Sequence, residues 1–324
     1  MLKVENLTRK FRALTAVDDV GFEVARGEIF GFLGPNGAGK TTTISMICTL
    51  LRPTSGRIEL DGIDVVRRPG AARGRMGLIF QDPSLDERLT AAENMEIQAR
   101  LYGVPRGEIE GRIDELLRLV RLNERRNSLV KTFSGGMRRR LEVARGLIHS
   151  PRILFLDEPT LGLDLQTRKL IWDYIVRLRR EKDITIFMTT HYIEEAEICD
   201  RVAIIDRGKI VALDSPRRLV EETCRETITL TTDDDETFCR KADEILGVSA
   251  ACVDGTVRIS ATGGDALIPE LFTRVPVRIR SISYKKPTLD DAFIELTGRS
   301  VREEEGGGVE VRMRSMYRLT QRRR

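Results

Sequence analysis

The segment with the clearest chemistry covers residues 34–41 and reads GPNGAGKT. This spacing matches G-x-x-x-x-G-K-[ST], a loop whose backbone N–H groups surround phosphate oxygens. An apolar run at 29–33 precedes the loop and a helix-compatible run at 42–51 follows it, as the motif requires. A glycine-rich turn without a ligand is the alternative, and Lys40 and Thr41 in register disfavour it. We expect Lys40 to reach the β- and γ-phosphates of a nucleotide and the Thr41 hydroxyl to bind Mg²⁺. The residues predicted to form this site are Gly34, Pro35, Asn36, Gly37, Ala38, Gly39, Lys40, Thr41 and Thr42.

Two carboxylates end the apolar run ILFLDEP at residues 153–159. An apolar strand followed by an acid is the Mg²⁺-binding element expected beside a phosphate loop. Asp157 is therefore a candidate Mg²⁺ ligand, directly or through water. Glu158 is placed to polarise the attacking water as a general base. A solvated acidic turn is the alternative, and the phosphate loop elsewhere in the chain disfavours it.

A second candidate anion site begins at Ser134, Gly135 and Gly136, which precede an amphipathic run. Such a sequence predicts a helix N-terminus with exposed N–H groups. One nucleotide cannot easily use both sites on the same protomer. The simplest interpretation is a head-to-tail dimer, in which each copy lends its second site to the nucleotide of the other.

Together these motifs, in this order over residues 1–215, resemble the ATP-binding subunits of ABC transporters. The resemblance implies a P-loop NTPase fold, ATP and Mg²⁺ as ligands, and a separate integral membrane permease as partner. Ser134, Gly135 and Gly136 fall on the family's signature motif. Gln81 falls on its Q-loop glutamine, implied to sense Mg²⁺ and to contact the permease.

For three further positions, a role is implied only by the resemblance to this family. Asp164 falls on the D-loop and would cross the dimer interface, and His191 falls on the switch histidine that contacts the γ-phosphate. Phe11 falls where the family stacks an aromatic ring on adenine. Alone, His191 would be read as a structural histidine and Phe11 as a core residue. The implied catalytic residues are Lys40, Glu158 and His191, and the implied metal ligands are Thr41, Gln81 and Asp157.

Two residues depart from the family pattern. Phe133 begins the signature where leucine is usual, and Leu165 follows the D-loop where proline is common. Neither change removes a group that contacts phosphate or transfers a proton. We therefore expect an active ATPase with two equivalent sites in a homodimer.

The remaining pattern predicts an α/β protein in three parts. An ATP-binding domain covers 1–215, with strands at 29–33, 57–60, 77–80, 153–156, 185–188 and 202–205 and a helical subdomain at about 81–145. A small α/β accessory domain covers 216–298, with a hairpin turn at 254–255. Its last helix is predicted to begin at Thr288, with Asp291 three residues on, and to end at Gly298. Residues 299–324 form a glycine-containing basic tail, read as a flexible end or as a contact for anionic lipid.

The amino-acid composition excludes several other classes of protein. The chain has 324 residues, 41% of them hydrophobic and 32% charged, so it can bury a core. Its net charge of +4 is too small to indicate an obligate nucleic-acid binder. Five scattered cysteines favour a reducing compartment over a disulfide framework. We see no apolar run long enough to cross a bilayer, and we expect a cytoplasmic protein peripheral to the membrane.

The C-terminal segment 286–298 is similar to that of drug-exporter ATPases of the daunorubicin-resistance type. This second resemblance implies an exporter, with drug or antibiotic efflux as one possibility. The main alternative is a soluble ABC ATPase that acts on DNA or ribosomes, although such relatives usually carry coiled-coil insertions, zinc modules or tandem ATPase units. A third alternative, a nucleotide-binding subunit that barely hydrolyses, is disfavoured by the intact Asp157–Glu158 pair. The sequence does not identify the transported molecule.

Overall fold

The computed structural model describes residues 1–80, 84–253 and 255–300. The described residues form two compact units, unit 1 at 1–216 and unit 2 at 217–300. Gln81 and the basic tail from residue 301 onward lie outside the described residues.

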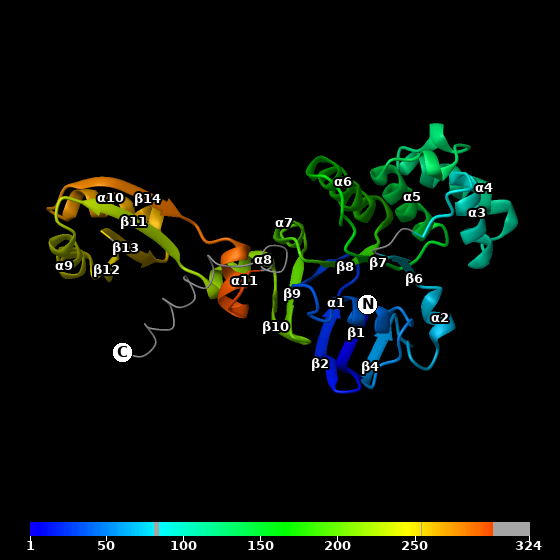
Figure 1. Ribbon diagram of the computed structural model, residues 1–324, viewed down its shortest axis with the longest axis horizontal. Coiled ribbons are helices and arrows are strands. Elements are labelled where there is room, and N and C mark those ends of the chain that lie inside the picture. Colours follow the sequence, from blue (N-terminus) through cyan, green and yellow to red (C-terminus); the bar gives the residue numbers. More distant parts are fainter. Residues whose placement is uncertain (81–83, 254, 301–324) are drawn as a thin grey trace. The chain divides into compact units, whose positions relative to one another are not determined.

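A six-stranded sheet forms the centre of unit 1, with strand order β10-β9-β3-β8-β7-β6 (Figure 1). Its five strands from β9 to β6 are mutually parallel, and β10 pairs antiparallel at the edge. Every residue of β3, β7 and β8 is buried. This explains the nearly continuous apolar sequences of β3 and β7 and the apolar centre of β8, because parallel strands are covered on both faces. The strands are β3 (Ile29–Leu33), β6 (Met76–Ile79), β7 (Ile153–Asp157), β8 (Thr185–Thr190), β9 (Arg201–Asp206) and β10 (Lys209–Asp214).

A four-stranded antiparallel sheet with strand order β2-β1-β4-β5 completes the core of unit 1. The predicted strand at 57–60 belongs to this sheet, and the sequence prediction missed β1 and β2. Exposed and buried residues roughly alternate along β1 and β2, so neither has the apolar run that marks a parallel strand. The strands are β1 (Leu2–Phe11), β2 (Leu14–Val24), β4 (Ser55–Leu60) and β5 (Ile63–Asp64).

Helix α1 (Lys40–Ile47) contributes Ile44, Met46 and Ile47 to a single core cluster that includes residues of both sheets. Phenylalanines connect the sheets: the Phe22 ring on β2 lies 5.8 Å from that of Phe187 on β8 and 5.3 Å from that of Phe30 on β3, centroid to centroid. The helix begins two residues earlier and ends four residues earlier than the predicted run at 42–51.

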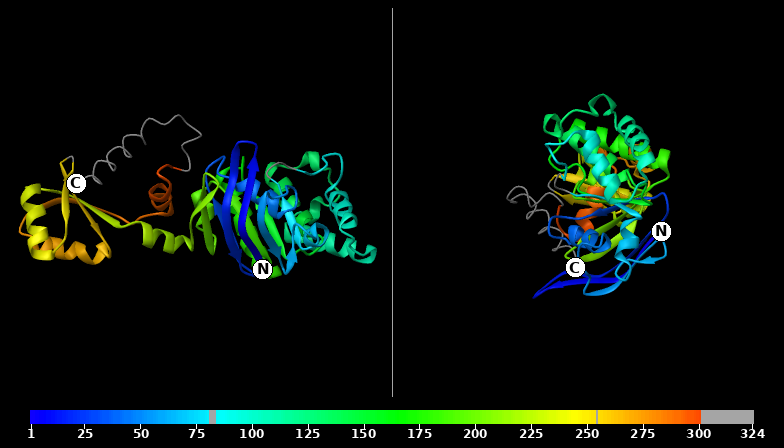
Figure 2. Two further views of the ribbon diagram at one scale, coloured as in Figure 1. Left: turned by 90° about the horizontal axis from the view of Figure 1, so that it is seen from below. Right: turned by 90° about the vertical axis from the view of Figure 1, so that its right-hand side faces the viewer.

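The predicted helical subdomain is confirmed. Helices α3, α4 and α5 gather at one end of unit 1, beyond β6 (Figures 1 and 2). A capping box at Thr90 and Glu93 starts α3. Two further helices, α6 and α7, follow β7 and β8. Besides α1, the helices of unit 1 are α2 (Pro69–Arg73), α3 (Ala91–Leu101), α4 (Arg106–Leu119), α5 (Gly135–Leu147), α6 (Leu165–Lys182) and α7 (Ile193–Ala196), with short 3₁₀ turns at Asn123–Arg125 and Val130–Thr132.

Unit 2 is the predicted small α/β domain, and its sheet has strand order β12-β13-β11-β14 with antiparallel pairs throughout. The chain order β-α-β-β-α-β with this sheet is the ferredoxin-like arrangement. Val253 pairs with Thr256 across the predicted hairpin, whose residue Asp254 lies outside the described residues. The elements are α8 (Pro216–Thr223), β11 (Glu226–Thr232), α9 (Asp235–Leu246), β12 (Ala250–Val253), β13 (Thr256–Ala261), α10 (Gly264–Arg274), β14 (Ile279–Lys285) and α11 (Leu289–Thr297).

The predicted start and end of the last helix are confirmed. Thr288 and Asp291 form a capping box at the start of α11, and Gly298 ends it in the left-handed conformation, with φ 76°. Among the described residues, no helix is both long enough and apolar enough to span a membrane.

Candidate nucleotide site

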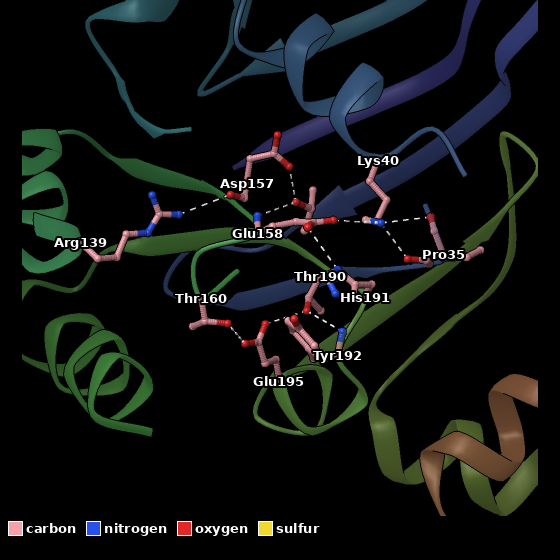
Figure 3. Close-up of polar contacts among 12 residues, drawn as sticks. Pro35, Lys40, Arg139, Asp157, Glu158, Thr160, Thr190, His191, Tyr192 and Glu195 are labelled. Atoms are coloured by element: carbon pink, nitrogen blue, oxygen red, sulfur yellow. Dashed lines mark hydrogen bonds and ion pairs between the residues drawn. The ribbon is translucent and has the colours of Figure 1, made fainter. Parts of the chain in front are cut away.

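Strand order brings the predicted catalytic segments together at one edge of the central sheet. Strands β3, β8 and β7 are neighbours and parallel, so their carboxyl ends meet at that edge. Residues 34–39 follow β3, Asp157 ends β7 and Glu158 comes directly after it, and His191 follows β8 (Figure 3). The carboxyl edge of a parallel sheet is where α/β proteins place their ligands.

The loop after β3 has a shape that only glycine permits at two positions. A Cβ atom on Gly34 would lie 2.4 Å from the Ile205 carbonyl oxygen. At Gly39, where φ is +105°, it would lie 2.6 Å from the Ala16 carbonyl oxygen. Helix α1 begins directly after Gly39, so its unpaired N–H groups lie at the loop. The tip residues Asn36 and Gly37 are exposed, which leaves the loop open to a ligand.

The Lys40 side chain turns back into this loop and is only 4% exposed. Its ammonium group donates hydrogen bonds to the carbonyl oxygens of Gly34, at 2.8 Å, and Pro35, at 3.1 Å. The same nitrogen lies 3.2 Å from Oε1 of Glu158, forming a buried ion pair. Lys40 thus links the phosphate loop to the end of β7.

Glu158 takes an unusual backbone conformation, with φ 44° in the left-handed region. Its N–H donates to both the carbonyl oxygen and the hydroxyl of Thr189 on β8, which holds this conformation in place. Its carboxylate, 8% exposed, contacts Lys40 on one side and His191 Nδ1, at 3.2 Å, on the other. Burial acts to raise the pKa of Glu158, but the His191 contact and the Lys40 charge outweigh it and hold the pKa below its ordinary value. The carboxylate is therefore ionised at neutral pH, as a proton acceptor must be.

Asp157 has the opposite electrostatic balance. Burial, with the nearby charge of Glu158, raises the pKa of Asp157, although hydrogen bonds from the Thr189 and Thr41 hydroxyls offset part of that effect. A buried carboxylate beside a threonine hydroxyl supplies the oxygen ligands that Mg²⁺ prefers. A bound cation would also relieve the unfavourable burial of this charge.

His191 lies at ion-pair distance from Glu158, but neither ring nitrogen has a hydrogen bond of normal geometry. Its ring is nearly buried and lies 4.0 Å from the Tyr192 ring, centroid to centroid. A buried imidazole without hydrogen-bond partners is unusual, since buried polar groups are nearly always paired. The ring is consequently able to bind a further polar group at the site. His149 is remote in the fold: it contacts the Met76 carbonyl oxygen and stacks on Tyr102.

A buried network under the site was missed by sequence reasoning. The Glu195 carboxylate on α7 accepts hydrogen bonds from the Thr160 and Thr190 hydroxyls. Thr190 in turn accepts a 2.9 Å bond from the Tyr192 N–H (Figure 3). The network joins the segment after Glu158 to the segment that carries His191. Its residues are two ordinary threonines and one glutamate in a helical run, so the sequence gives no signal for it.

Arg139 on α5 is a second residue that sequence reasoning missed. Its nearly buried guanidinium donates to the carbonyl oxygens of Pro159 and Phe80, each at 2.6 Å, and pairs with Glu142 at 2.9 Å. It connects α5, which begins at the signature residues, to the strand ends that carry Glu158. In the sequence it is one of three consecutive arginines, and only its burial distinguishes it.

The other predicted residues lie outside the Lys40–Glu158–His191 cluster. Ser134 caps α5 by accepting a hydrogen bond from the Met137 N–H, and Gly135 and Gly136 form the first turn of that helix. Asp164 caps α6 through Thr167, whose hydrogen bonds lower the pKa of Asp164. Phe11 ends β1, 40% exposed, with the Arg9 guanidinium 4.5 Å above its ring. Thr42 is half-buried in α1, and Gln81 lies outside the described residues.

Comparison with known proteins agrees with this geometry. The ABC transporter family model matches residues 17–161. The linearmycin resistance ATP-binding protein LnrL of Bacillus subtilis is 35% identical, over 94% of this chain and 100% of the relative. The daunorubicin/doxorubicin resistance ATP-binding protein DrrA of Streptomyces peucetius is 36% identical, over 92% of each chain. The Nod factor export ATP-binding protein I of Ralstonia nicotianae is 36% identical, over 94% of this chain and 95% of the relative.

Solved structures are similar over about two thirds of the chain. An ATP-binding subunit of an ABC transporter has a TM-score of 0.62 and 32% identity, covering 68% of this chain and 92% of that one. A dimeric ATP-binding cassette in a post-hydrolysis state, bound to ADP and Pi, has a TM-score of 0.60 and 28% identity, covering 66% of this chain and 98% of that one. The chain therefore belongs to the ABC transporter family, as an ATP-binding subunit with ATPase activity.

Proposed function

We propose that Glu158 is the general base for ATP hydrolysis at the edge of the central sheet, with Lys40 and His191 beside it. The observation that carries this proposal is the contact of one ionised carboxylate with both partners, at 3.2 Å each. Lys40 binds the β- and γ-phosphates, and His191 binds the γ-phosphate through Nε2, which has no hydrogen bond and is not the atom that contacts Glu158. Gly34, Pro35, Asn36, Gly37, Ala38, Gly39 and Thr42 line the phosphate loop.

Asp157 and Thr41 are the residues that would hold Mg²⁺, with Gln81 as a further proposed ligand. The ion would supply positive charge to neutralise the phosphate oxygens during transfer. The Asp157 carboxylate and the Thr41 hydroxyl fit this role because both are oxygen ligands and already lie in hydrogen-bond contact.

The Lys40 ammonium group already contacts other acceptors at the site, namely the Glu158 carboxylate and two loop carbonyl oxygens. Nucleotide phosphates compete for the same ammonium group, because they are stronger acceptors than carbonyl oxygens. We infer that nucleotide binding releases the Glu158 carboxylate from Lys40.

A homodimer completes the proposed site. Ser134, Gly135 and Gly136 present the N-terminus of α5, and in a head-to-tail pair they would contact the nucleotide held by the other copy. Asp164, exposed at the start of α6, would lie at the dimer interface. Phe11, exposed at the end of β1, would stack on adenine.

The chain is proposed to power export through a separate membrane permease on the cytoplasmic face. Relatives named for linearmycin and daunorubicin/doxorubicin resistance support a drug or antibiotic as cargo, and no nucleic acid is expected as a partner. Closure of the dimer on ATP would drive the permease, since the bound nucleotide adds contacts only in the closed form. Co-expression with the native permease, followed by resistance assays, tests the cargo class.

The base assignment is tested by Mg²⁺-dependent ATP hydrolysis with the purified chain. We expect Glu158→Gln to lower kcat by about 10² to 10⁴-fold, the usual contribution of general base catalysis. Glu197→Gln, an exposed change six residues after His191, is the matched control and should keep the parent rate. A Glu158→Gln protein that hydrolyses ATP as fast as the parent would show that another group activates the water.

A further inference from the structure

Two of the five cysteines meet in unit 2 although thirteen positions separate them in sequence. Cys239 on α9 and Cys252 on β12 have Sγ atoms 2.9 Å apart. A disulfide bond is about 2.05 Å long, so an approach of under about 1 Å would join them. The two elements already pack against each other, and bond formation therefore requires no large backbone movement.

The other cysteines differ from this pair in place and environment. Cys48 and Cys199 are buried in unit 1, where burial raises the pKa of each thiol and suppresses its reactivity. Cys224 is half-buried just after α8.

We propose that Cys239 and Cys252 are a modification site: a dithiol that forms a reversible disulfide by exchange with a small disulfide such as oxidised glutathione. The Cys252 thiolate attacks one glutathione sulfur, which forms a mixed disulfide and releases one glutathione thiolate. The Cys239 thiolate then attacks the Cys252 sulfur, which forms the Cys239–Cys252 bond and releases the second glutathione. The protein loses two protons and two electrons, and oxidised glutathione becomes two glutathione thiols.

The surroundings assign the order of the two steps. Cys252 is exposed and can meet the small disulfide, whereas Cys239 packs against the core of unit 2. Burial, followed by the hydrogen bond and charge of Cys252, raises the pKa of Cys239 to about 12. The contribution of Cys252 disappears once that thiol is held in a mixed disulfide. Cys239 then becomes easier to ionise at the step where it must attack.

The bond would fix a sheet edge. Strand β12 is the outermost strand, held on one side by β13. The disulfide would tie it covalently to α9 on the face of the sheet. Oxidation is thus expected to restrain an edge strand that pairs with β13 alone.

To test the proposal, the native full chain is incubated with oxidised glutathione. The number of free thiols and the masses of its tryptic peptides are then measured. Trypsin cleaves after Arg240 and Lys241, so the two cysteines fall in different peptides, residues 226–240 and 242–258. We expect loss of two of the five thiols, a linked pair of these peptides two hydrogens lighter than their sum, and full reversal by dithiothreitol. A stable glutathione adduct, a disulfide between two chains, or five persistent thiols would overturn the proposal.

Three variants test the order of attack. Cys239→Ser should stop at the mixed disulfide on Cys252. In Cys252→Ser, glutathione should attach to Cys239 more than tenfold more slowly than it attaches to Cys252 in Cys239→Ser. Cys224→Ser, the matched control, should form the linked peptides at the parent rate. Glutathione attachment to Cys239 in Cys252→Ser as fast as attachment to Cys252 in Cys239→Ser would refute the assigned order. These experiments measure thiols and peptide masses and do not measure ATP hydrolysis. A negative result would therefore contradict the disulfide proposal without bearing on the proposed ATPase mechanism.

Discussion

At the scale of single residues, neighbouring carboxylates at the end of β7 are held in opposite electrostatic states. Burial dominates at Asp157, whereas Lys40 and His191 dominate at Glu158. One group thus carries an unfavourable charge that a cation would relieve, and the other a stable charge that can accept a proton. The two pKa values shift in opposite directions because Glu158 contacts Lys40 and His191, whereas burial dominates at Asp157. Residue type alone does not predict these surroundings.

The raised pKa of Asp157 predicts a pH-dependent stability effect. A carboxyl with a raised native pKa destabilises the fold when it is ionised, above that pKa, and costs nothing below the unfolded-state value of about 3.9. Asp157→Asn should therefore raise the thermal midpoint of the nucleotide-free protein at pH 7, with the gain shrinking as the pH falls. Asp164→Asn should show the opposite sign at pH 7, because the pKa of Asp164 is lowered. Calorimetry from pH 4 to pH 8 measures both, and a destabilised Asp157→Asn protein at pH 7 would contradict the account.

Thr189 offers a second test at this scale. Its hydroxyl bonds the Asp157 carboxylate and accepts from the Glu158 N–H, so it positions both acids. Thr189→Val should raise the Mg²⁺ concentration needed for half-maximal ATPase activity severalfold. The matched control is Thr185→Val on the same strand, which loses only a hydroxyl that accepts from the Gly27 N–H. If both variants shift the Mg²⁺ requirement equally, Thr189 has no special role at the site.

At the scale of elements, the sequence predicted most of the strands that carry the site. Strands β3, β7 and β8 are buried on both faces, and such strands read as apolar runs. Strands β1 and β2 were missed because only one of their faces is buried. The Glu195 network and the Arg139 contacts were also missed, since they depend on which distant elements pack together and leave no local pattern in the sequence.

Ser134 combines two roles that a pair of variants can separate. As the cap of α5 it accepts the Met137 N–H, and its loss should cost about 1 kcal/mol of stability. Thr90 caps α3 in the same unit, so Thr90→Ala should cost a similar amount. We expect Ser134→Ala to lower kcat/KM for ATP tenfold or more, and Thr90→Ala to leave it within about twofold. If the two variants lose similar stability and have equal kcat/KM for ATP, Ser134 serves only as a helix cap.

At the scale of the whole molecule, one protomer holds Lys40 and Ser134 at separate helix N-termini. Lys40 begins α1, and Ser134 caps α5 at the edge of the helical subdomain. In a two-fold symmetric dimer, the Lys40 site of each copy would face the Ser134 helix start of the other copy. Every proposed role of the signature residues depends on that pairing.

Mixing two inactive variants tests the pairing most directly. Lys40→Ala removes the phosphate lysine and Ser134→Arg blocks the signature, so each variant alone should hydrolyse no ATP above background. In a 1:1 mixture about half of the dimers are mixed, and each mixed dimer keeps one of its two sites intact. The account predicts recovery of about a quarter of the parent ATPase rate for independent sites. A mixture no more active than the two variants measured separately would contradict a nucleotide shared between two chains.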